Sequence, residues 1–127
     1  MTEKKQIYKC NICGNVVEIL QIGIGELVCC NGKMELINEK TEDEGQEKHL
    51  PVIEKTEQGV RIKIGLIDHP MEEKHYIEWI EINTIDNKSG KKFLRPGDQP
   101  VADFYSKIEI KNIRAYCNIH GLWQKRL

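Results

Sequence analysis

The final cysteine and the final histidine of the chain form the motif Cys117-Asn118-Ile119-His120. A Cys-x-x-His spacing lets a thiolate and an imidazole bind one metal ion. Together with the other three histidines of the chain, this motif could supply four imidazoles and one thiolate to a metal. Such a set suits iron, copper, nickel or zinc. On a metal that prefers six ligands, five protein ligands leave one position open for chemistry. The other three histidines fall within one segment of the same apparent domain: His49, His69 and His75.

The remaining four cysteines lie between residues 10 and 30, as Cys10-x-x-Cys13 and the adjacent pair Cys29-Cys30. Gly14 favours a turn in which backbone N–H groups point at the sulfur atoms. Adjacent side chains in extended backbone point to opposite faces, so the second pair needs turn-like backbone to bind one metal. Because disulfides are rare in a reducing cytoplasm, the five cysteines predict two metal sites. Ligand identity leaves iron and zinc open at the sulfur site.

Short strands are expected to position the cysteines, at residues 6–9 and 16–20, with a glycine-punctuated turn at 22–25. Residues 1–37 are too few to bury a sufficient core, so a metal is expected to hold this unit together. Residues 38–46 are rich in charged side chains, contain glycine and lack large apolar side chains. We interpret them as a linker between two domains.

The pattern after residue 46 is typical of short β-strands. Residues 60–66 and 104–111 alternate apolar and polar side chains, and residues 75–85 resemble a strand with both faces partly covered. Turn signals at 87–91 and 95–100 separate them, and no helix is predicted. Residues 47–127 therefore predict a β-sandwich. His69 directly precedes Pro70 and His49 precedes Leu50-Pro51, so both are expected in irregular backbone where functional loops occur.

Composition argues against several classes of function. The formal net charge is −1 with 31% charged residues, which argues against a broad basic face for nucleic acid. Aromatic residues make up 6%, which argues against a base-stacking surface. No apolar run is long enough to span a bilayer, and the N-terminus resembles no signal segment. We therefore expect a cytoplasmic protein that binds neither nucleic acid nor membrane.

These motifs together resemble desulfoferrodoxin, the two-iron form of superoxide reductase, over nearly the whole chain. The resemblance implies a mainly β protein with a desulforedoxin-like iron domain at residues 1–37, a linker at 38–46 and an immunoglobulin-like β-sandwich at 47–127. It also implies a homodimer. The matching motifs are Cys10-x-x-Cys13 with Cys29-Cys30, Glu47-Lys48-His49-x-Pro51-Val52-Ile53-Glu54, His69-Pro70-Met71-x-x-x-His75-Tyr76-Ile77 and Cys117-Asn118-x-His120-Gly121-x-Trp123.

The resemblance also assigns residues to two irons. Cys10, Cys13, Cys29 and Cys30 would bind the first. In the family, four histidines surround the catalytic iron in a plane, a cysteine is axial and the sixth position is free. The corresponding residues here are His49, His69, His75, His120 and Cys117. Lys48 would add a local positive charge and order a proton-donating water, and Glu47 would occupy the sixth position of the ferric form.

The resulting hypothesis is an oxidoreductase that detoxifies superoxide. One electron and two protons would convert superoxide to hydrogen peroxide without release of dioxygen. The resemblance suggests rubredoxin or a similar small redox protein as the electron donor. Two alternatives stay open from the sequence. One is a superoxide dismutase that uses the same open position, and the other is a non-catalytic electron carrier that uses the four-cysteine centre.

Overall fold

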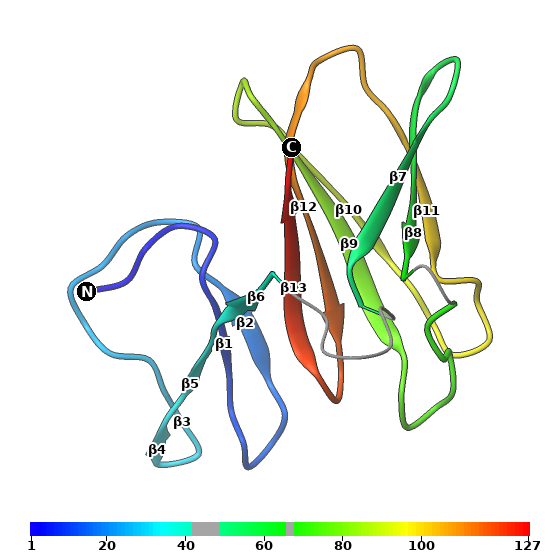
Figure 1. Ribbon diagram of the computed structural model, residues 1–127. Helices are drawn as coiled ribbons and strands as arrows, with labels where there is room; N and C mark the ends of the chain where they lie inside the picture. Colours follow the sequence, from blue (N-terminus) through cyan, green and yellow to red (C-terminus); the bar gives the residue numbers. More distant parts are fainter. Residues whose placement is uncertain (42–48, 66–67) are drawn as a thin grey trace. The chain divides into compact units, whose positions relative to one another are not determined.

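The computed structural model describes residues 1–41, 49–65 and 68–127. These residues form β-strands, turns and loops, and contain no helix. The chain divides into two compact units, Met1–Asn38 and Glu39–Leu127 (Figure 1). The predicted mainly β fold class is confirmed. Within the described ranges, no helix is long and apolar enough to cross a membrane.

The first unit is built from two small sheets. A three-stranded antiparallel sheet has the order β2-β1-β5, and a separate hairpin pairs β3 with β4. Cys30 and Asn31 form the two-residue turn of this hairpin, and both have left-handed backbone, with φ of 52° and 60°. Positive φ at both positions is typical of a type I′ hairpin turn. The strands are β1 (Ile7–Lys9), β2 (Val16–Glu18), β3 (Val28–Cys29), β4 (Gly32–Lys33) and β5 (Glu35–Ile37).

The second unit contains two sheets, both visible in Figure 1. The larger has the order β10-β9-β12-β13-β6, and the smaller has the order β11-β8-β7. The strand pairs are antiparallel except for β6, which runs parallel to β13. The strands are β6 (Glu39–Lys40), β7 (Pro51–Lys55), β8 (Gly59–Ile64), β9 (Ile77–Thr84), β10 (Ser89–Phe93), β11 (Val101–Tyr105), β12 (Ile110–Cys117) and β13 (Gly121–Arg126).

Alternating side chains of the two sheets meet in one hydrophobic core. Alternate residues of a strand point to the same face, so one apolar row per strand is enough to build a sandwich. Ile62 and Ile64 of β8 pack in the same buried cluster as Ile80 and Ile82 of β9. The cluster also contains Ala102, Ile113, Ala115 and Cys117. The end of β12 therefore brings a cysteine directly into the core.

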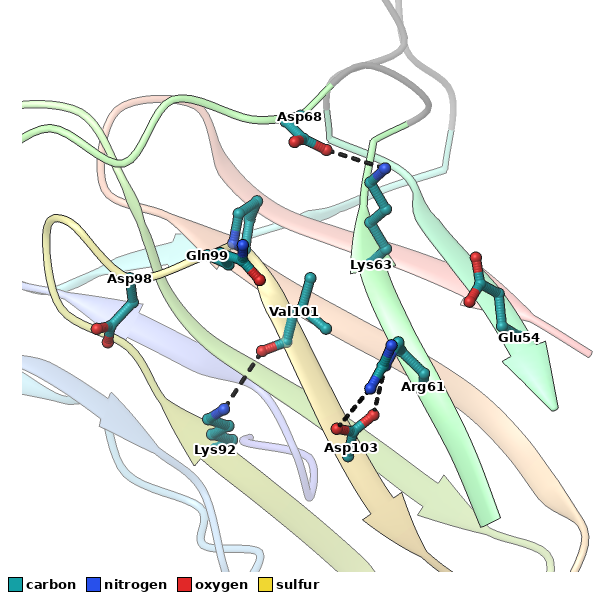
Figure 2. A pocket seen from close by; sticks show the side chains of 10 residues that line it. Glu54, Arg61, Lys63, Asp68, Lys92, Asp98, Gln99, Val101 and Asp103 are labelled. Carbon is teal, nitrogen blue, oxygen red and sulfur yellow. Dashed lines mark hydrogen bonds and ion pairs between the residues drawn. The ribbon is translucent and has the colours of Figure 1, made fainter. Parts of the chain in front are cut away.

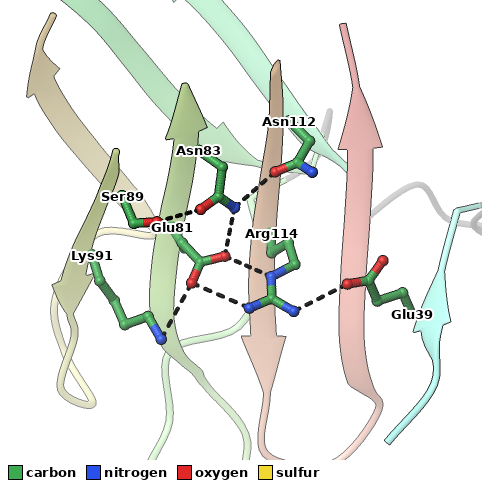
Figure 3. A network of polar contacts seen from close by, with 7 residues as sticks. All are labelled: Glu39, Glu81, Asn83, Ser89, Lys91, Asn112 and Arg114. Atoms are coloured by element: carbon green, nitrogen blue, oxygen red, sulfur yellow. Dashed lines mark hydrogen bonds and ion pairs between the residues drawn. The ribbon is translucent and has the colours of Figure 1, made fainter. Parts of the chain in front are cut away.

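The other face of the larger sheet carries a buried network of charged and amide side chains (Figure 3). Arg114 and Glu81 are each only 1% exposed, and Arg114 Nε donates to Glu81 Oε2 at 2.6 Å. Asn83 Nδ2 donates to the same oxygen at 2.8 Å, and Lys91 Nζ lies 3.4 Å from Glu81 Oε1. Arg114 also donates to Glu39 at 3.0 Å. The network therefore fastens β6 to the sheet.

Strand β6 lies within residues 38–46, the segment expected to be a linker. Its two residues pair with β13, Glu39 opposite Leu122 and Lys40 opposite Trp123. Part of the expected linker thus forms the edge strand of the larger sheet.

The outer face of the smaller sheet is charged and hollowed (Figure 2). Arg61 of β8 donates to Asp103 of β11 at 2.8 Å, and Lys63 pairs with Asp68 at 3.0 Å. The Arg61 and Asp103 side chains remain 51% and 45% exposed. This face is therefore a solvated surface. Exposed ion pairs of this kind contribute only about 0–1 kcal/mol each to stability.

Candidate metal centres

Five of the predicted ligands come together at one end of the sandwich. Donor atoms of the four histidines and of Cys117 all lie within 4.8 Å of one another. His49 precedes β7, His69 and His75 lie between β8 and β9, Cys117 ends β12, and His120 lies in the turn before β13. Residues 71 positions apart in the chain are therefore adjacent in the fold, as the 3.0 Å separation of His49 Nε2 and His120 Nδ1 demonstrates.

The four imidazoles form a closed cycle. The ring centroids of successive neighbours are 4.8, 4.7, 4.9 and 4.8 Å apart, in the order His49, His69, His75, His120 and back to His49. Each pair meets edge to face, with interplanar angles between 64° and 82°. Cys117 Sγ lies 3.8 Å from His120 Nδ1. Near-equal spacing around one point is the arrangement expected of four nitrogen ligands of a single ion.

His69 is prepared to bind a metal through Nε2. Its Nδ1 lies 2.7 Å from the carbonyl oxygen of Pro70, which fixes Nδ1 as the protonated nitrogen. Nε2 is buried and has no hydrogen-bond partner among the described residues. Burial lowers the pKa of His69 to about 4, so the ring is neutral at pH 7. A buried nitrogen lone pair without a donor is costly, and a metal ion satisfies it.

Cys117 offers a buried thiolate on the core side of the cycle. The residue is fully buried, and burial raises the pKa of its thiol. Backbone N–H groups of His120 and Ile119 oppose this rise, and His120 N lies 3.4 Å from the sulfur. A bound cation would keep the sulfur ionised, because a coordinating thiol is deprotonated. The Cys-x-x-His turn therefore supplies both the ligand and the N–H groups that stabilise its charge.

Asn118 connects this turn to the segment that carries His75. Its Oδ1 accepts a hydrogen bond from Tyr76 N at 2.9 Å, and its Nδ2 donates to Lys74 O at 3.1 Å. The two bonds hold the backbone on both sides of His75 against the turn between Cys117 and His120. The sequence motif contained this asparagine, but its spacing alone indicated no role for it.

Trp123 sets the orientation of another ligand. Its ring stacks on that of His49, with centroids 4.5 Å apart and an interplanar angle of 10°. Trp123 is 6% exposed and lies on β13, so a rigid strand supports the loop residue His49. The tryptophan also belonged to the sequence motif, although no pattern in the sequence predicted its contact with His49.

The four remaining cysteines form the second group, within the first unit. Their sulfur atoms lie within 4.8 Å of one another, with Cys13 and Cys29 3.6 Å apart and Cys29 and Cys30 3.9 Å apart. A disulfide would require about 2.05 Å. A tetrahedral ion with metal–sulfur bonds of about 2.3 Å has edges of roughly 3.8 Å between its sulfurs. The observed separations fit such an ion.

Ionisation of these thiols also favours a central cation. Backbone N–H groups of Cys13 and Ile12 lower the pKa of Cys10 to about 6. Hydrogen bonding with the neighbouring sulfurs, that of Cys13 first, raises the pKa of Cys30 to about 12. The first thiolate forms readily, and the following ones need a positive charge among them. The type I′ turn at Cys30-Asn31 explains how two adjacent cysteines reach one ion.

Comparison with known proteins identifies both units. The family model described as desulfoferrodoxin matches residues 41–126, and that described as desulfoferrodoxin, N-terminal domain, matches residues 2–37. The chain belongs to the desulfoferrodoxin family. The two donor groups match the two iron sites of desulfoferrodoxin, one with four cysteines and one with four histidines and a cysteine. The resemblance inferred from the motifs is thus confirmed.

Relatives of the chain include enzymes with solved structures. A desulfoferrodoxin homolog of Archaeoglobus fulgidus is 54% identical over 124 residues, 98% of each chain. A superoxide reductase of Treponema pallidum has the same fold, with a TM-score of 0.79 and 23% identity over 95% of this chain and 97% of its own. A 1Fe superoxide reductase of Giardia intestinalis is 34% identical, with a TM-score of 0.55, covering 65% of this chain and 98% of its own.

Two predicted residues of the desulfoferrodoxin site have no structural description. Glu47 and Lys48 fall in the range 42–48, which lies outside the described residues. They directly precede His49 in the chain. Their roles stay predictions.

Proposed function

We propose that this protein is a superoxide reductase, which converts superoxide to hydrogen peroxide with one electron and two protons. The observation that carries the proposal is the donor set of four imidazoles and one buried cysteine sulfur around a single point. Bound there, iron would supply the one-electron chemistry. Five protein ligands leave one position of a six-coordinate ion for a small anion.

The chain's own residues favour an anionic substrate at that position. A neutral imidazole such as His69 contributes no negative charge, so the site stays cationic when it holds a metal. Cys117 is buried, whereas His120 is exposed. A small anion would therefore approach a bound ion from the solvent side, away from the buried sulfur, and hydrogen peroxide would leave by the same side. We assign electron donation by the thiolate to Cys117, as thiolate ligands do in haem enzymes.

The proposal includes two partners. We propose rubredoxin or a similar small redox protein as the electron donor, as the family resemblance suggests. We also propose a homodimer. The first unit exposes large apolar side chains, a feature of interaction surfaces, and these include Ile12, Leu20, Ile24 and Val28, between 63% and 91% exposed. Mass measurement in solution tests this assembly.

Oxygen measurement distinguishes the proposed reaction from the alternatives. Iron-loaded protein, kept reduced by a donor, would receive superoxide generated by radiolysis. A reductase should form one hydrogen peroxide per superoxide and release no dioxygen. A dismutase would release one dioxygen for every two superoxide ions, and an electron carrier would not accelerate superoxide loss. Either of the last two results would reject the proposal.

Cys13→Ser should bleach the four-cysteine centre and leave superoxide reduction by the pre-reduced protein nearly unchanged. Four sulfur ligands complete a tetrahedral ion and leave no open position for superoxide. Visible absorption would report the loss of the first centre, and pulse radiolysis would report the reaction at the second. If the reaction collapsed while the second iron remained bound, the four-cysteine centre would be essential to catalysis.

Lys48→Ala should slow the second-order reaction with superoxide, by up to roughly tenfold. The net charge is −1, so attraction of an anion has to be local. A lysine next to His49 can attract superoxide within roughly a Debye length, about 8–10 Å. The rate should also depend less on ionic strength. Pulse radiolysis across a salt series measures both effects.

Lys74→Ala is the matched control for this prediction, because Glu73-Lys74-His75 repeats the Glu47-Lys48-His49 sequence. It should have a much smaller effect, and both variants should keep the iron content and spectrum of the parent. Equal effects of the two substitutions would show that steering is diffuse. Lys48 would then be an ordinary surface charge.

A further inference from the structure

Lys40 contacts two parts of the histidine site from the edge of the sheet. Its Nζ donates a hydrogen bond of 2.8 Å to the carbonyl oxygen of His120. The same ammonium lies 5.1 Å from the centre of the Trp123 ring, within the range of a cation–π interaction. Trp123 in turn stacks on His49. One exposed cation is therefore bonded to the backbone of His120 and, through the Trp123 ring, lies next to the stack that contains His49.

These two imidazoles are neighbours in the cycle but come from distant parts of the chain. His49 precedes β7, and His120 lies between β12 and β13. Their ring nitrogens are 3.0 Å apart. Lys40, on β6, belongs to neither segment, yet it holds one through the His120 carbonyl and the other through Trp123. Its contacts therefore span the His49–His120 edge of the cycle.

The backbone of Lys40 is fixed independently of these contacts. Lys40 pairs with Trp123 across β6 and β13, and its neighbour Glu39 pairs with Leu122. The Glu39 carboxylate, on the opposite face of the strand, accepts a hydrogen bond from buried Arg114 at 3.0 Å. A long lysine side chain normally loses entropy when it is held. A fixed strand reduces that cost, because the backbone already directs the Lys40 side chain toward Trp123 and the His120 turn.

We propose that Lys40 is a positioning residue of the five-ligand iron centre. It holds the His120 turn next to the Trp123–His49 stack, and it places an ammonium group beside the cycle. The inference rests on the iron site of the proposed function, and it does not depend on which substrate that site reduces. A ferric ion carries one more positive charge than a ferrous ion, so a nearby cation favours the ferrous form. Solvent exposure keeps this effect modest.

Lys40→Met tests the proposal in the full-length, iron-loaded protein, because methionine keeps an unbranched stem and removes the ammonium. The midpoint potential of the five-ligand iron should fall, and its thiolate-to-iron charge-transfer band should shift. Iron loss to a chelator should accelerate about fivefold, the equivalent of one ordinary hydrogen bond. Lys40→Arg keeps a positive charge and a hydrogen-bond donor at this position. Its midpoint potential, absorption band and rate of iron loss should therefore lie closer to those of the parent than to those of Lys40→Met.

Lys125→Met is the matched control, since Lys125 is an exposed lysine on the same strand as Trp123. It should leave the potential, the band and the iron loss unchanged. The proposal is overturned if Lys40→Met behaves as Lys125→Met does, or if it lowers only the resistance to denaturant. None of these measurements uses superoxide. A protein that failed the oxygen measurement could still confirm the role of Lys40, and the reverse also holds.

Discussion

Cys117→Ser should abolish the thiolate-to-iron charge-transfer absorption and reduce superoxide turnover by more than about 100-fold. Groups that merely orient a metal ligand typically cost about 10–100-fold when removed, and Cys117 is itself a proposed ligand. Serine replaces an ionised sulfur with a hydroxyl that stays protonated. The substitution would therefore remove the proposed electron-donating ligand and leave the four histidines in place. Absorption spectra and pulse radiolysis measure the two losses.

Iron analysis is the necessary control, because a variant without metal would be inactive for a trivial reason. The four-cysteine centre provides an internal standard, since its ligands lie in the other unit and should keep their own absorption. If the variant turned over superoxide at the parent's rate with normal iron occupancy, Cys117 would have no part in the mechanism.

Arg114→Met should destabilise the second unit by about 3–5 kcal/mol, the usual cost of breaking a buried ion pair. Burial alone would raise the pKa of Glu81, but its bonds to Arg114 and Asn83 hold that pKa below the ordinary value. Without Arg114, a carboxylate that is 1% exposed still has Lys91 Nζ 3.4 Å away, but it loses its buried cation. The carboxylate must then stay charged at a high cost or become protonated.

Denaturant unfolding followed by tryptophan fluorescence measures this loss in the second unit, which contains both tryptophans of the chain, Trp79 and Trp123. Arg61→Met is the matched control. It breaks an arginine–carboxylate pair of the same kind on an exposed surface, where the expected cost is about 0–1 kcal/mol. Equal costs for Arg61→Met and Arg114→Met would mean that burial of the network contributes nothing specific.

Patterns that extend over a whole strand were predictable from the sequence. Alternation at residues 60–66 corresponds to β8, and the apolar segment 75–85 corresponds to β9, which is buried on both faces. Nine residues with metal-binding chemistry stood out because their side chains are few and of the right type. The structure gathers them into two groups. Such features depend on residue type and period, which the sequence states directly.

Alternation of apolar and polar residues gave a wrong prediction where a turn has the same alternating pattern as a strand. Residues 104–111 alternate like one strand, but that prediction is wrong, because β11 ends at Tyr105 and β12 begins at Ile110. Ser106 explains the interruption. Its hydroxyl donates to Ile108 O at 2.9 Å and accepts from Ile108 N at 3.2 Å, a local turn that satisfies the backbone without a partner strand.

Contacts between residues that are distant in the chain could not be predicted from the sequence either. Strand β6 has two residues, both charged, so it shows no periodicity and resembles a solvated linker. Its place in the sheet depends on Arg114, 75 residues further along the chain. Likewise, the stacking of Trp123 on His49 depends on the paths of two separate segments. No spacing rule in a single sequence contains such information.

The gathering of Cys13 and Cys29 in one four-sulfur group has a consequence for the unfolded chain. An ion held by Cys13 and Cys29 closes a loop over residues 14–28, and it acts as a covalent cross-link would. Closing a loop of about 15 residues lowers the entropy of the denatured ensemble by the equivalent of about 3 kcal/mol. The first unit has little core of its own to replace that contribution. Its folding equilibrium is therefore tied to metal supply, whereas the sandwich keeps a hydrophobic core that no ion has to complete.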